Sequence, residues 1–204
     1  MDELQRQHLI DLHQQSLALH GYSPHALYWG SRGIQKARFR VLAEIGILAG
    51  DSLLDVGCGF ADLDSWLSSQ RMPVAYTGID LSPDLIARAE ALHPQAELIC
   101  GELFDFASPS QYFDWVVLSG TLNWELNDDG NYARRVIAGM FALCRQGVAF
   151  NMLNSHHPEM RALHDLTTFD PDEIRAFCKT ITPDCHCRSD YLDNDFTIYM
   201  RRPA

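Results

Sequence analysis

The spacing of apolar residues changes near residue 51, and this change divides the chain into two parts. Before that point, apolar residues recur mainly three or four positions apart, which predicts amphipathic helices over 4–19 and 34–45. Gly21 and Gly46 follow these two stretches, as glycines that end helices do, and Ser23 opens a short helix or turn between them. The first fifty residues are therefore predicted to form a helical extension.

After residue 51 the pattern changes to short apolar runs that alternate with longer helical stretches. This alternation is typical of right-handed βαβ units, in which helices join parallel strands. A parallel sheet with helices on both faces is therefore expected. The predicted strands span 52–56, 75–79, 96–100, 115–118 and 148–152, and the predicted helices span 62–69, 83–92, 132–143 and 171–179.

The C-terminal segment breaks this alternation. Its two apolar runs, 185–191 and 195–201, are separated by only three residues, which predicts an antiparallel hairpin. The whole pattern indicates an α/β fold, with a doubly wound, mostly parallel, seven-stranded sheet of Rossmann-like type and an antiparallel C-terminal hairpin strand. We therefore expect one domain over 1–204, with a helical cap over 1–50 and an α/β core over 51–204.

Composition supports a globular chain and restricts its partners. The 204 residues are 47% hydrophobic and 21% charged, which is ordinary for one domain with a sizeable core. The formal net charge of −11 repels a phosphate backbone, so nucleic acid is disfavoured as a partner. The basic residues Arg32, Lys36, Arg38 and Arg40 recur at helical spacing, and we interpret them as a solvated helix face.

No run of apolar residues approaches the length of about 20 that crosses a bilayer, and the N-terminal residues carry no apolar signal segment. The expected location is the cytoplasm, without membrane attachment. The six cysteines lack the regular spacing of a disulfide framework, which favours reduced thiols. Cys185, His186 and Cys187 alternate between the faces of a predicted strand, so no metal is expected there.

Chemically suitable residues follow the first three predicted strands. In open parallel sheets, ligands bind beyond the carboxyl ends of the strands. The first strand leads into Asp55-Val56-Gly57-Cys58-Gly59, whose glycines let a ligand approach the backbone. Asp80 follows the second strand, 21 residues after Gly59, where a nucleoside-binding fold places an acid on the ribose hydroxyls. Glu102, after the third strand, can accept a hydrogen bond from an exocyclic amine.

Asp62 narrows the choice of ligand. It stands where many nucleotide-binding turns have a third glycine, and its carboxylate would repel a pyrophosphate. A dinucleotide oxidoreductase, which the sheet pattern alone allows, is thereby disfavoured. Each acid also has a purely structural interpretation, because Asp62 favours a helix N-terminus and Asp80 suits a turn before the predicted N-cap Ser82. Taken together, the strand ends favour a ligand site.

Four stretches resemble, in order and spacing, the successive motifs of class I S-adenosylmethionine-dependent methyltransferases: LLDVGCGFADL, YTGIDLSPDLIARAEAL, AELICGELFDF and FDWVVLSGTLN. The resemblance covers about residues 50–152, and the closing hairpin also fits that fold. S-adenosylmethionine is a cationic nucleoside without phosphate, so acids attract it. The resemblance implies that it is bound by Asp55, Gly57, Cys58, Gly59, Asp62, Asp80, Leu81, Gly101, Glu102, Leu103, Ser119 and Gly120.

The same resemblance implies a role for several of these residues. Gly57 and Gly59 pass under the methionine and the ribose. Asp80 holds the ribose diol, and Glu102 lies near the adenine. Asp55 orients the glycine turn or reaches the cofactor's ammonium group through water. The strand ends would then form an acidic site around the cofactor.

The implied activity is transfer of a methyl group, by in-line displacement, to an oxygen or nitrogen of a small-molecule acceptor. The acceptor pocket is expected to form from the segments after the fourth and fifth strands and from the N-terminal helices. His156 is the candidate base, because imidazole titrates near neutrality, although a surface loop before Pro158 is an equally good interpretation. The candidate pocket residues are Tyr28, Trp29, Arg32, Asn123, Trp124 and Asn154, together with Thr121, Glu125 and His157.

Alternatives remain open for the activity. The stretch LSGTLN departs from the Asn/Asp-Pro-Pro-aromatic sequence of enzymes that methylate amino groups of nucleic acids, so nucleic acid is again disfavoured. A chain of this kind can also bind the cofactor without transferring its methyl group. It can instead act on a peptide or protein, for which an acidic surface favours basic substrates. The oligomeric state stays open, since residues 4–19 suit a cofactor lid or a dimer surface equally.

Overall fold

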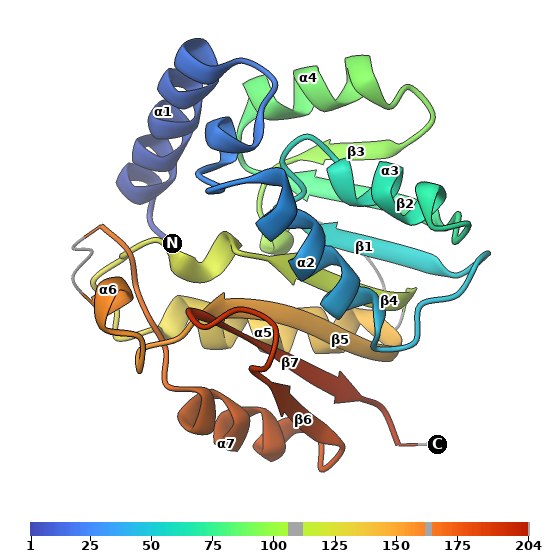
Figure 1. Ribbon diagram of the computed structural model, residues 1–204, viewed down its shortest axis with the longest axis vertical. Helices are drawn as coiled ribbons and strands as arrows, with labels where there is room; N and C mark the ends of the chain where they lie inside the picture. The colour runs from blue at the N-terminus through green and yellow to red at the C-terminus, as the bar shows by residue number, and fades with distance from the viewer. Residues whose placement is uncertain (106–111, 162–164, 204) are drawn as a thin grey trace.

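The computed structural model describes residues 1–105, 112–161 and 165–203. A seven-stranded sheet runs through the centre of the molecule (Figure 1). Its strands are β1 (Ser52–Val56), β2 (Ala75–Asp80), β3 (Glu97–Cys100), β4 (Phe113–Ser119), β5 (Cys144–Leu153), β6 (Cys185–Arg188) and β7 (Asp195–Arg201). The spatial order is β3-β2-β1-β4-β5-β7-β6, and β7 is antiparallel to both of its neighbours. The predicted fold class is confirmed.

The helical elements of the described residues are α1 (Glu3–His20), η1 (Pro24–Leu27), α2 (Arg32–Ala43), α3 (Asp62–Ser69), α4 (Pro83–Leu92), η2 (Leu103–Asp105), η3 (Thr121–Asn123), α5 (Asn131–Leu143), α6 (Pro158–Arg161) and α7 (Pro171–Ile181). Ser82, the predicted N-cap of α4, accepts a hydrogen bond from the amide of Leu85. The side chains of Ser31 and Asp170 cap α2 and α7 in the same way. These caps explain why the three helices begin where they do.

Each face of the sheet has its own apolar core. On one face, Phe39 of α2 and Leu67 of α3 belong to a cluster with strand residues such as Trp115. On the other face, Ile137 of α5 and Phe150 of β5 belong to a larger cluster, to which α7 also contributes. α2 is therefore part of a helical layer of the sheet, although its residues come from the first fifty, which the pattern assigns to the cap.

Element boundaries agree with the predictions within a few residues, apart from two strands. β5 begins at Cys144 rather than at residue 148, because α5 continues directly into it and the exposed side chains of Arg145 and Gln146 obscure its start. β6 ends at Arg188 rather than at residue 191, since its pairing with β7 stops there. The hairpin is antiparallel as predicted, and β7 lies between β5 and β6.

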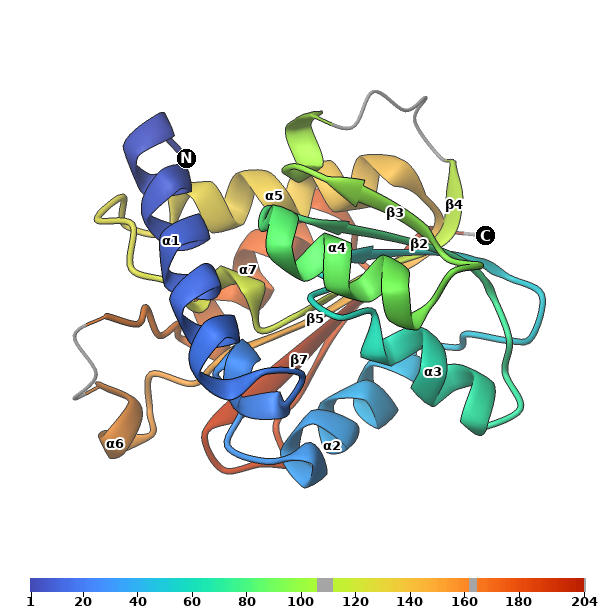
Figure 2. The same cartoon turned by 90° about the horizontal axis from the view of Figure 1, so that it is seen from above.

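α1 lies across the edge of the sheet at which the parallel strands end (Figure 2). Only Leu9 and Ser16 of its 18 residues are buried. A polar contact ties its first turn to the segment between η3 and α5, because the side-chain amide of Gln5 donates to the carbonyl oxygen of Leu126 at 2.8 Å. Like the other helices of the described residues, α1 is not both long and apolar enough to cross a membrane.

Candidate active site

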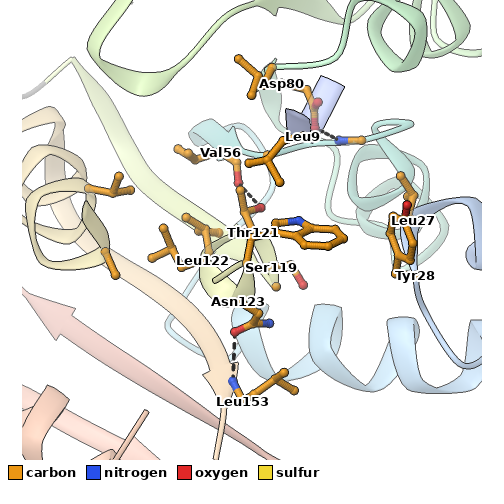
Figure 3. A pocket seen from close by; sticks show the side chains of 18 of the residues that line it. Leu9, Leu27, Tyr28, Val56, Asp80, Ser119, Thr121, Leu122, Asn123 and Leu153 are labelled. Carbon is orange, nitrogen blue, oxygen red and sulfur yellow. Dashed lines mark hydrogen bonds between the residues drawn. The ribbon is translucent and has the colours of Figure 1, made fainter. Parts of the chain in front are cut away.

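A cavity of about 400 Å³ opens at the carboxyl ends of the parallel strands (Figure 3). The register explains its place, since Val56 pairs with Ile79 and with Leu118, so that the residues after these strands meet at one edge. N-terminal residues, among them Leu9 and Tyr28, form another part of the wall. All the residues that the resemblance assigns to the cofactor line this cavity: Asp55, Gly57, Cys58, Gly59, Asp62, Asp80, Leu81, Gly101, Glu102, Leu103, Ser119 and Gly120.

The glycine turn after β1 is shaped by close contacts that exclude side chains. Gly57 and Gly59 have φ angles of 72° and 55°, in the left-handed region that favours glycine. A Cβ atom on Gly57 would lie 1.9 Å from Oγ1 of Thr121, and one on Gly59 would lie 2.9 Å from Cδ1 of Leu27. The amide of Gly57 donates to the carbonyl oxygen of Ile79 at 2.7 Å, which ties the turn to β2. The turn thus presents bare backbone to the cavity.

Asp80, at the end of β2, holds the glycine turn and lines the cavity (Figure 3). Its Oδ2 accepts a hydrogen bond from the amide of Gly59 at 2.9 Å, and its Oδ1 accepts one from the amide of Ser82 at 2.9 Å. Each carboxylate oxygen has a second lone pair. Asp80 is therefore fixed in position and can still accept from two neighbouring hydroxyl groups.

Asp55 lies in β1, two residues before Gly57, and is only 3% exposed. The hydroxyl of Tyr76 donates to its Oδ2 at 2.7 Å. Burial raises the pKa of Asp55 to about 7, against the lowering effect of this hydrogen bond. Burial also raises the pKa of the Cys58 thiol, which is therefore protonated at neutral pH. Asp55, at the end of β1, and Cys58, within the turn, are thus buried side chains that line the cavity.

The carboxylate of Asp62 is shared with the N-terminal elements. Its Oδ1 accepts from the hydroxyl of Tyr22 at 2.7 Å, and its Oδ2 accepts from Nε2 of Gln35 at 2.9 Å. Nη1 of Arg32 lies 4.0 Å from the same Oδ2. The preceding residue, Ala61, has a φ angle of 58°, so α3 begins after a left-handed residue. Asp62 therefore lines the cavity and also attaches α2 and the segment before it to the core.

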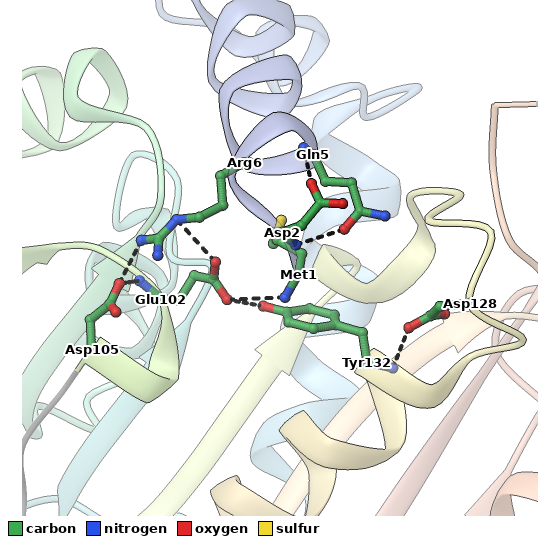
Figure 4. A network of polar contacts seen from close by, with 8 residues as sticks. All are labelled: Met1, Asp2, Gln5, Arg6, Glu102, Asp105, Asp128 and Tyr132. Carbon is green, nitrogen blue, oxygen red and sulfur yellow. Dashed lines mark hydrogen bonds and ion pairs between the residues drawn. The ribbon is translucent and has the colours of Figure 1, made fainter.

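Glu102, after β3, joins a polar network between α1 and α5 (Figure 4). The hydroxyl of Tyr132 donates to its Oε2 at 2.8 Å, and Nε of Arg6 lies 3.1 Å from its Oε1. Arg6 also donates through Nη2 to Asp105 at 2.6 Å. The amide of Glu102 and the guanidinium of Arg6 lower the pKa of Asp105, whereas burial raises the pKa of Tyr132. Residues of α1 and α5 therefore enclose the predicted adenine end of the site.

Aromatic side chains form the part of the cavity away from Asp80. The rings of Tyr28 and Trp124 pack edge to face with centroids 5.0 Å apart, and His13 packs against Tyr28 at 5.8 Å. Asn123 is held in place, because its Oδ1 accepts from the amide of Leu153 at 3.1 Å (Figure 3). Four of the predicted pocket residues line this part, namely Tyr28, Trp29, Asn123 and Trp124, as does Thr121. We call it the acceptor chamber.

Five predicted residues lie outside the described cavity wall: Arg32, Glu125, Asn154, His156 and His157. The side chain of His156 is 61% exposed, and its Nε2 lies 2.9 Å from Oδ2 of Asp170. Asp170 is the N-cap of α7, and Asn154 accepts a hydrogen bond from the amide of His156 within their own loop. The geometry gives no support to His156 as a base.

His13 lines the cavity, and no sequence pattern singles it out. Its Nδ1 lies 2.9 Å from the carbonyl oxygen of Leu9. Because a carbonyl oxygen only accepts, Nδ1 carries the proton of the neutral ring and Nε2 holds the lone pair. A histidine within a helix belongs to no local motif, so only the course of α1 across the strand ends identifies His13.

Arg38 contradicts the interpretation of residues 32–40 as a solvated face. It is 6% exposed, lines the cavity, and pairs with the fully buried carboxylate of Asp195. Its guanidinium stacks on Trp29, with Cζ 4.5 Å from the ring centroid. The sequence does contain an indication that Arg38 is buried. Position 38 lies four residues after Ile34 and four before Leu42, within the apolar stripe of α2.

Comparison with known proteins agrees with this site. A family model described as a methyltransferase domain matches residues 53–147. A Mycobacterium tuberculosis protein whose name proposes that it is a methyltransferase is 31% identical over 162 residues, which cover 75% of this chain and 94% of that protein. An uncharacterized methyltransferase of Schizosaccharomyces pombe is 36% identical over 113 residues, which cover 51% of this chain and 43% of that protein.

Solved structures share the fold. The magnesium protoporphyrin IX methyltransferase of Synechocystis PCC 6803, with bound SAH, matches with a TM-score of 0.66 and 14% identity over 84% of each chain. A SAM-dependent methyltransferase of Archaeoglobus fulgidus matches with a TM-score of 0.68 and 13% identity, over 85% of this chain and 95% of that one. The chain therefore belongs to the class I S-adenosylmethionine-dependent methyltransferases. S-adenosylmethionine is its cofactor.

The groups that line the cavity fit this cofactor. At Gly57 a Cβ atom would collide with Thr121, so the turn is kept free of side chains where a ligand approaches the backbone. Asp80 retains lone pairs for a ribose diol. Asp62 and Glu102 add negative charge around a ligand that is cationic and carries no phosphate.

Proposed function

We propose that the protein transfers the methyl group of S-adenosylmethionine to an oxygen or nitrogen atom of a small-molecule acceptor. The observation that carries this proposal is the acceptor chamber, which continues the cofactor cavity and is walled by His13, Tyr28 and Trp124 from three separate segments. An aromatic-walled chamber within a cavity of about 400 Å³ suits a small molecule better than a polymer.

In this proposal the cofactor lies along the strand ends. Gly57 and Gly59 let the backbone run close to the methionine and the ribose. Asp80 accepts hydrogen bonds from both ribose hydroxyls, and Glu102 accepts one from the adenine amine. Bound in this way, S-adenosylmethionine supplies a methyl group on a positively charged sulfur, which is already activated toward a nucleophile.

The chain then has to position the acceptor and exclude water. Leu9 and Leu27 bring apolar groups from the N-terminal elements into the cavity wall. Asn123 is oriented by the hydrogen bond from the amide of Leu153 to its Oδ1, which leaves its Nδ2 free to donate. We assign Asn123 to orienting the acceptor heteroatom in line with the sulfur–methyl bond.

We assign the role of base to His13 rather than to His156. A hydroxyl acceptor must lose its proton as the methyl group is transferred, and a neutral imidazole can take it. His13 lines the chamber with its Nε2 lone pair unprotonated in the neutral ring, whereas the ring of His156 lies outside the described cavity wall. A free amine acceptor needs less help, since its lone pair is already available.

Labelling of acceptor pools tests this function. The full chain is incubated with methyl-labelled S-adenosylmethionine and pools of small alcohols, phenols and amines, and in parallel with peptide pools, and the products are separated by mass. Labelled small molecules that depend on the wild-type chain and are lost in Asp80→Asn are expected. Label found only in peptides would reject the small-molecule acceptor, and cofactor binding without transfer in any pool would indicate a binding role.

A further inference from the structure

We propose that the acceptor is an aliphatic amine, whose nitrogen is held in the acceptor chamber by the rings of His13, Tyr28 and Trp124. The proposal rests on the methyl transfer proposed above and narrows its acceptor atom to nitrogen. Three observations carry it: the angles between these rings, the ring surface that stays open to a ligand, and the charge of the cavity wall.

The three rings stand nearly at right angles to one another, as three faces of a box do. Tyr28 and Trp124 meet at 87°. His13 meets Tyr28 at 84° and Trp124 at 75°, with its centroid 5.8 and 5.9 Å from theirs. No two of the three rings are parallel, so they do not form a slot in which a flat acceptor would stack on both of its faces. A corner of perpendicular aromatic faces instead suits a compact cation such as a substituted ammonium.

Each of these rings keeps surface for a ligand. All three line the cavity, and none is buried, since Tyr28 is 50% exposed and the other two are half-buried. The polar atoms of two of them are already engaged with α1. The hydroxyl of Tyr28 donates to the carbonyl oxygen of Leu12 at 3.0 Å, and Nδ1 of His13 lies 2.9 Å from that of Leu9. These residues therefore offer a ligand their ring faces and the free Nε2 of His13.

Three separate segments fix this corner of rings in place. His13 belongs to α1. Tyr28 is the C-cap of η1 and has a φ angle of 60°, a left-handed conformation that is uncommon for a bulky residue. Trp124 forms an antiparallel β-bridge with Leu166. A corner that is formed before the ligand arrives loses little conformational entropy on binding.

The charge of the cavity wall favours a cationic acceptor over an anionic one. Acidic residues outnumber basic ones in the described wall. Arg38, the one lysine or arginine there, is paired with the buried carboxylate of Asp195. Asp128 belongs to the same wall, and its carboxylate keeps lone pairs beyond those that accept from the amides of Gly130 and Tyr132. An ammonium group is therefore attracted to this cavity, and an anionic acceptor is repelled.

Methylation of an amine brings positive charge into this corner. The acceptor nitrogen gives one proton to Nε2 of His13, which passes it to solvent, and the proton is lost more readily beside a positively charged sulfur. With the freed electron pair the nitrogen bonds to the methyl carbon and becomes positive, while the pair of the broken sulfur–methyl bond stays on sulfur. The faces of Tyr28 and Trp124 stabilise this charge as it develops. A hydroxyl acceptor yields a neutral ether and would gain nothing from them.

Two probes of the same shape test the corner by binding alone. Choline carries a positively charged nitrogen, and in neohexanol a carbon atom replaces that nitrogen. Each probe is titrated into the full chain saturated with S-adenosylhomocysteine and followed by NMR. We expect the wild type to bind choline about tenfold more tightly than neohexanol, because only choline gains from charge over the aromatic faces.

Variants at Tyr28 separate the ring face from the charge of the wall. Tyr28→Phe keeps the face and should keep the preference for choline. Tyr28→Leu and Trp124→Leu each remove one face, leave every acid in place, and should reduce the preference to about threefold or less. Tyr112→Leu removes a tyrosine of nearly equal exposure that lies outside the described cavity wall, so it is the matched control. An unchanged affinity for S-adenosylhomocysteine shows that a variant is folded.

A wild type that binds choline no more tightly than neohexanol, or that binds neither, would overturn the amine assignment. Phenol is titrated in parallel, and phenol that binds more tightly than choline would favour a flat hydroxyl acceptor and overturn it as well. A preference that persists in both leucine variants would mean that the charge of the wall alone selects the cation, which overturns the role of the rings. A wild type that does not bind S-adenosylhomocysteine would overturn the proposed function itself, which distinguishes the two failures.

Discussion

Nε of Arg6 lies 3.1 Å from Oε1 of Glu102, so a residue of α1 pairs with the carboxylate that follows β3 (Figure 4). α1 buries only two of its 18 residues, which means that polar links of this kind do much to hold it over the cavity. The side chain of Glu102 is 6% exposed, so the pair is less screened by solvent than an ordinary surface ion pair. The contact joins the wall of the cavity to the helix that lies across it.

Arg6→Ala is expected to loosen α1 while the sheet stays folded. The loss of the contacts with Glu102 and Asp105 removes about 1 to 3 kcal/mol from the docking of the helix, so its amides should exchange hydrogen about tenfold faster or more. Hydrogen–deuterium exchange with mass spectrometry measures this over residues 3–20. Gln7→Ala, on the exposed side of α1, is the control. Unchanged exchange in Arg6→Ala would show that other contacts hold the helix.

Asp80→Asn is expected to weaken the binding of S-adenosylhomocysteine by about 1 to 3 kcal/mol, because in the proposed binding mode an amide replaces one of the two oxygens that accept from the ribose. Isothermal titration calorimetry measures the affinity. Asp84→Asn, a half-buried carboxylate in the first turn of α4, is the control, and its affinity should equal that of the wild type. The melting temperature of Asp80→Asn without ligand shows whether the lost contact with Gly59 or Ser82 also loosens the turn. Equal affinities of Asp80→Asn and the wild type would remove Asp80 from the ribose site.

His13→Asn and His156→Asn separate the two candidate bases. With a hydroxyl acceptor identified in the labelling pools, His13→Asn is expected to lower kcat by about a hundredfold or more, since a base of this kind contributes about that factor. The affinity for S-adenosylhomocysteine should stay unchanged, because His13 lies on the acceptor side. His156→Asn is expected to leave kcat unchanged. A kcat that falls in His156→Asn and stays unchanged in His13→Asn would instead assign the role of base to His156.

The raised pKa of Asp55 predicts that this carboxyl makes the fold less stable as the pH rises. Its pKa is about 7 in the folded chain, against 3.8 when it is exposed, so the folded state holds a proton that the unfolded state has lost between these values. The contribution of the protonated Asp55 carboxyl to the free energy of unfolding is fully present below pH 3.8 and disappears as the pH rises through 7. The free energy of unfolding should therefore contain a contribution from Asp55 that grows by about 2 kcal/mol between pH 8 and pH 5.5.

Asp55→Asn tests this contribution. The variant has no titrating group at this position, so the difference between its free energy of unfolding and that of the wild type should change by about 2 kcal/mol across the same interval. Urea denaturation at several pH values gives both free energies. Tyr76→Phe removes the hydrogen bond that opposes the shift and should strengthen the pH dependence. A difference that is constant with pH would mean that Asp55 is ionised in the folded chain at neutral pH.

Local sequence features were sufficient for most of the fold and for the residues that meet at the strand-end cavity. The bounds of α3, α4, β1 and β7 equal the predicted ranges, because hydrophobic period and capping residues act within a few positions. Parallel strands end at a common edge, so the groups that follow β1, β2 and β3 had to meet there. The register supports this, since Asp55 lies beside Gly78 and Asp80 beside Cys100.

The acceptor side was less predictable, because it depends on which elements cross the strand ends. Tyr28, Trp29, Asn123 and Trp124 belong to segments that the sequence led us to expect over the cofactor, and all four line the cavity. His156 had the expected chemistry, but its loop pairs with the start of α7 instead of turning toward the cavity. No local sequence pattern shows whether a loop residue such as His156 turns toward the cavity or away from it.

The sequence by itself determined the order of the elements, the strand-end edge at which the cavity opens and the carboxylates placed along it, since each depends on residues a few positions apart. Only the tertiary structure decided which side chains complete that edge. His13 reaches the cavity because α1 crosses it, and Arg38 is buried because Asp195, on the last strand, neutralises it. Such contacts join residues that are far apart in the sequence. The position of a charged residue within an apolar stripe therefore does not show which residue of opposite charge it will pair with in the folded chain.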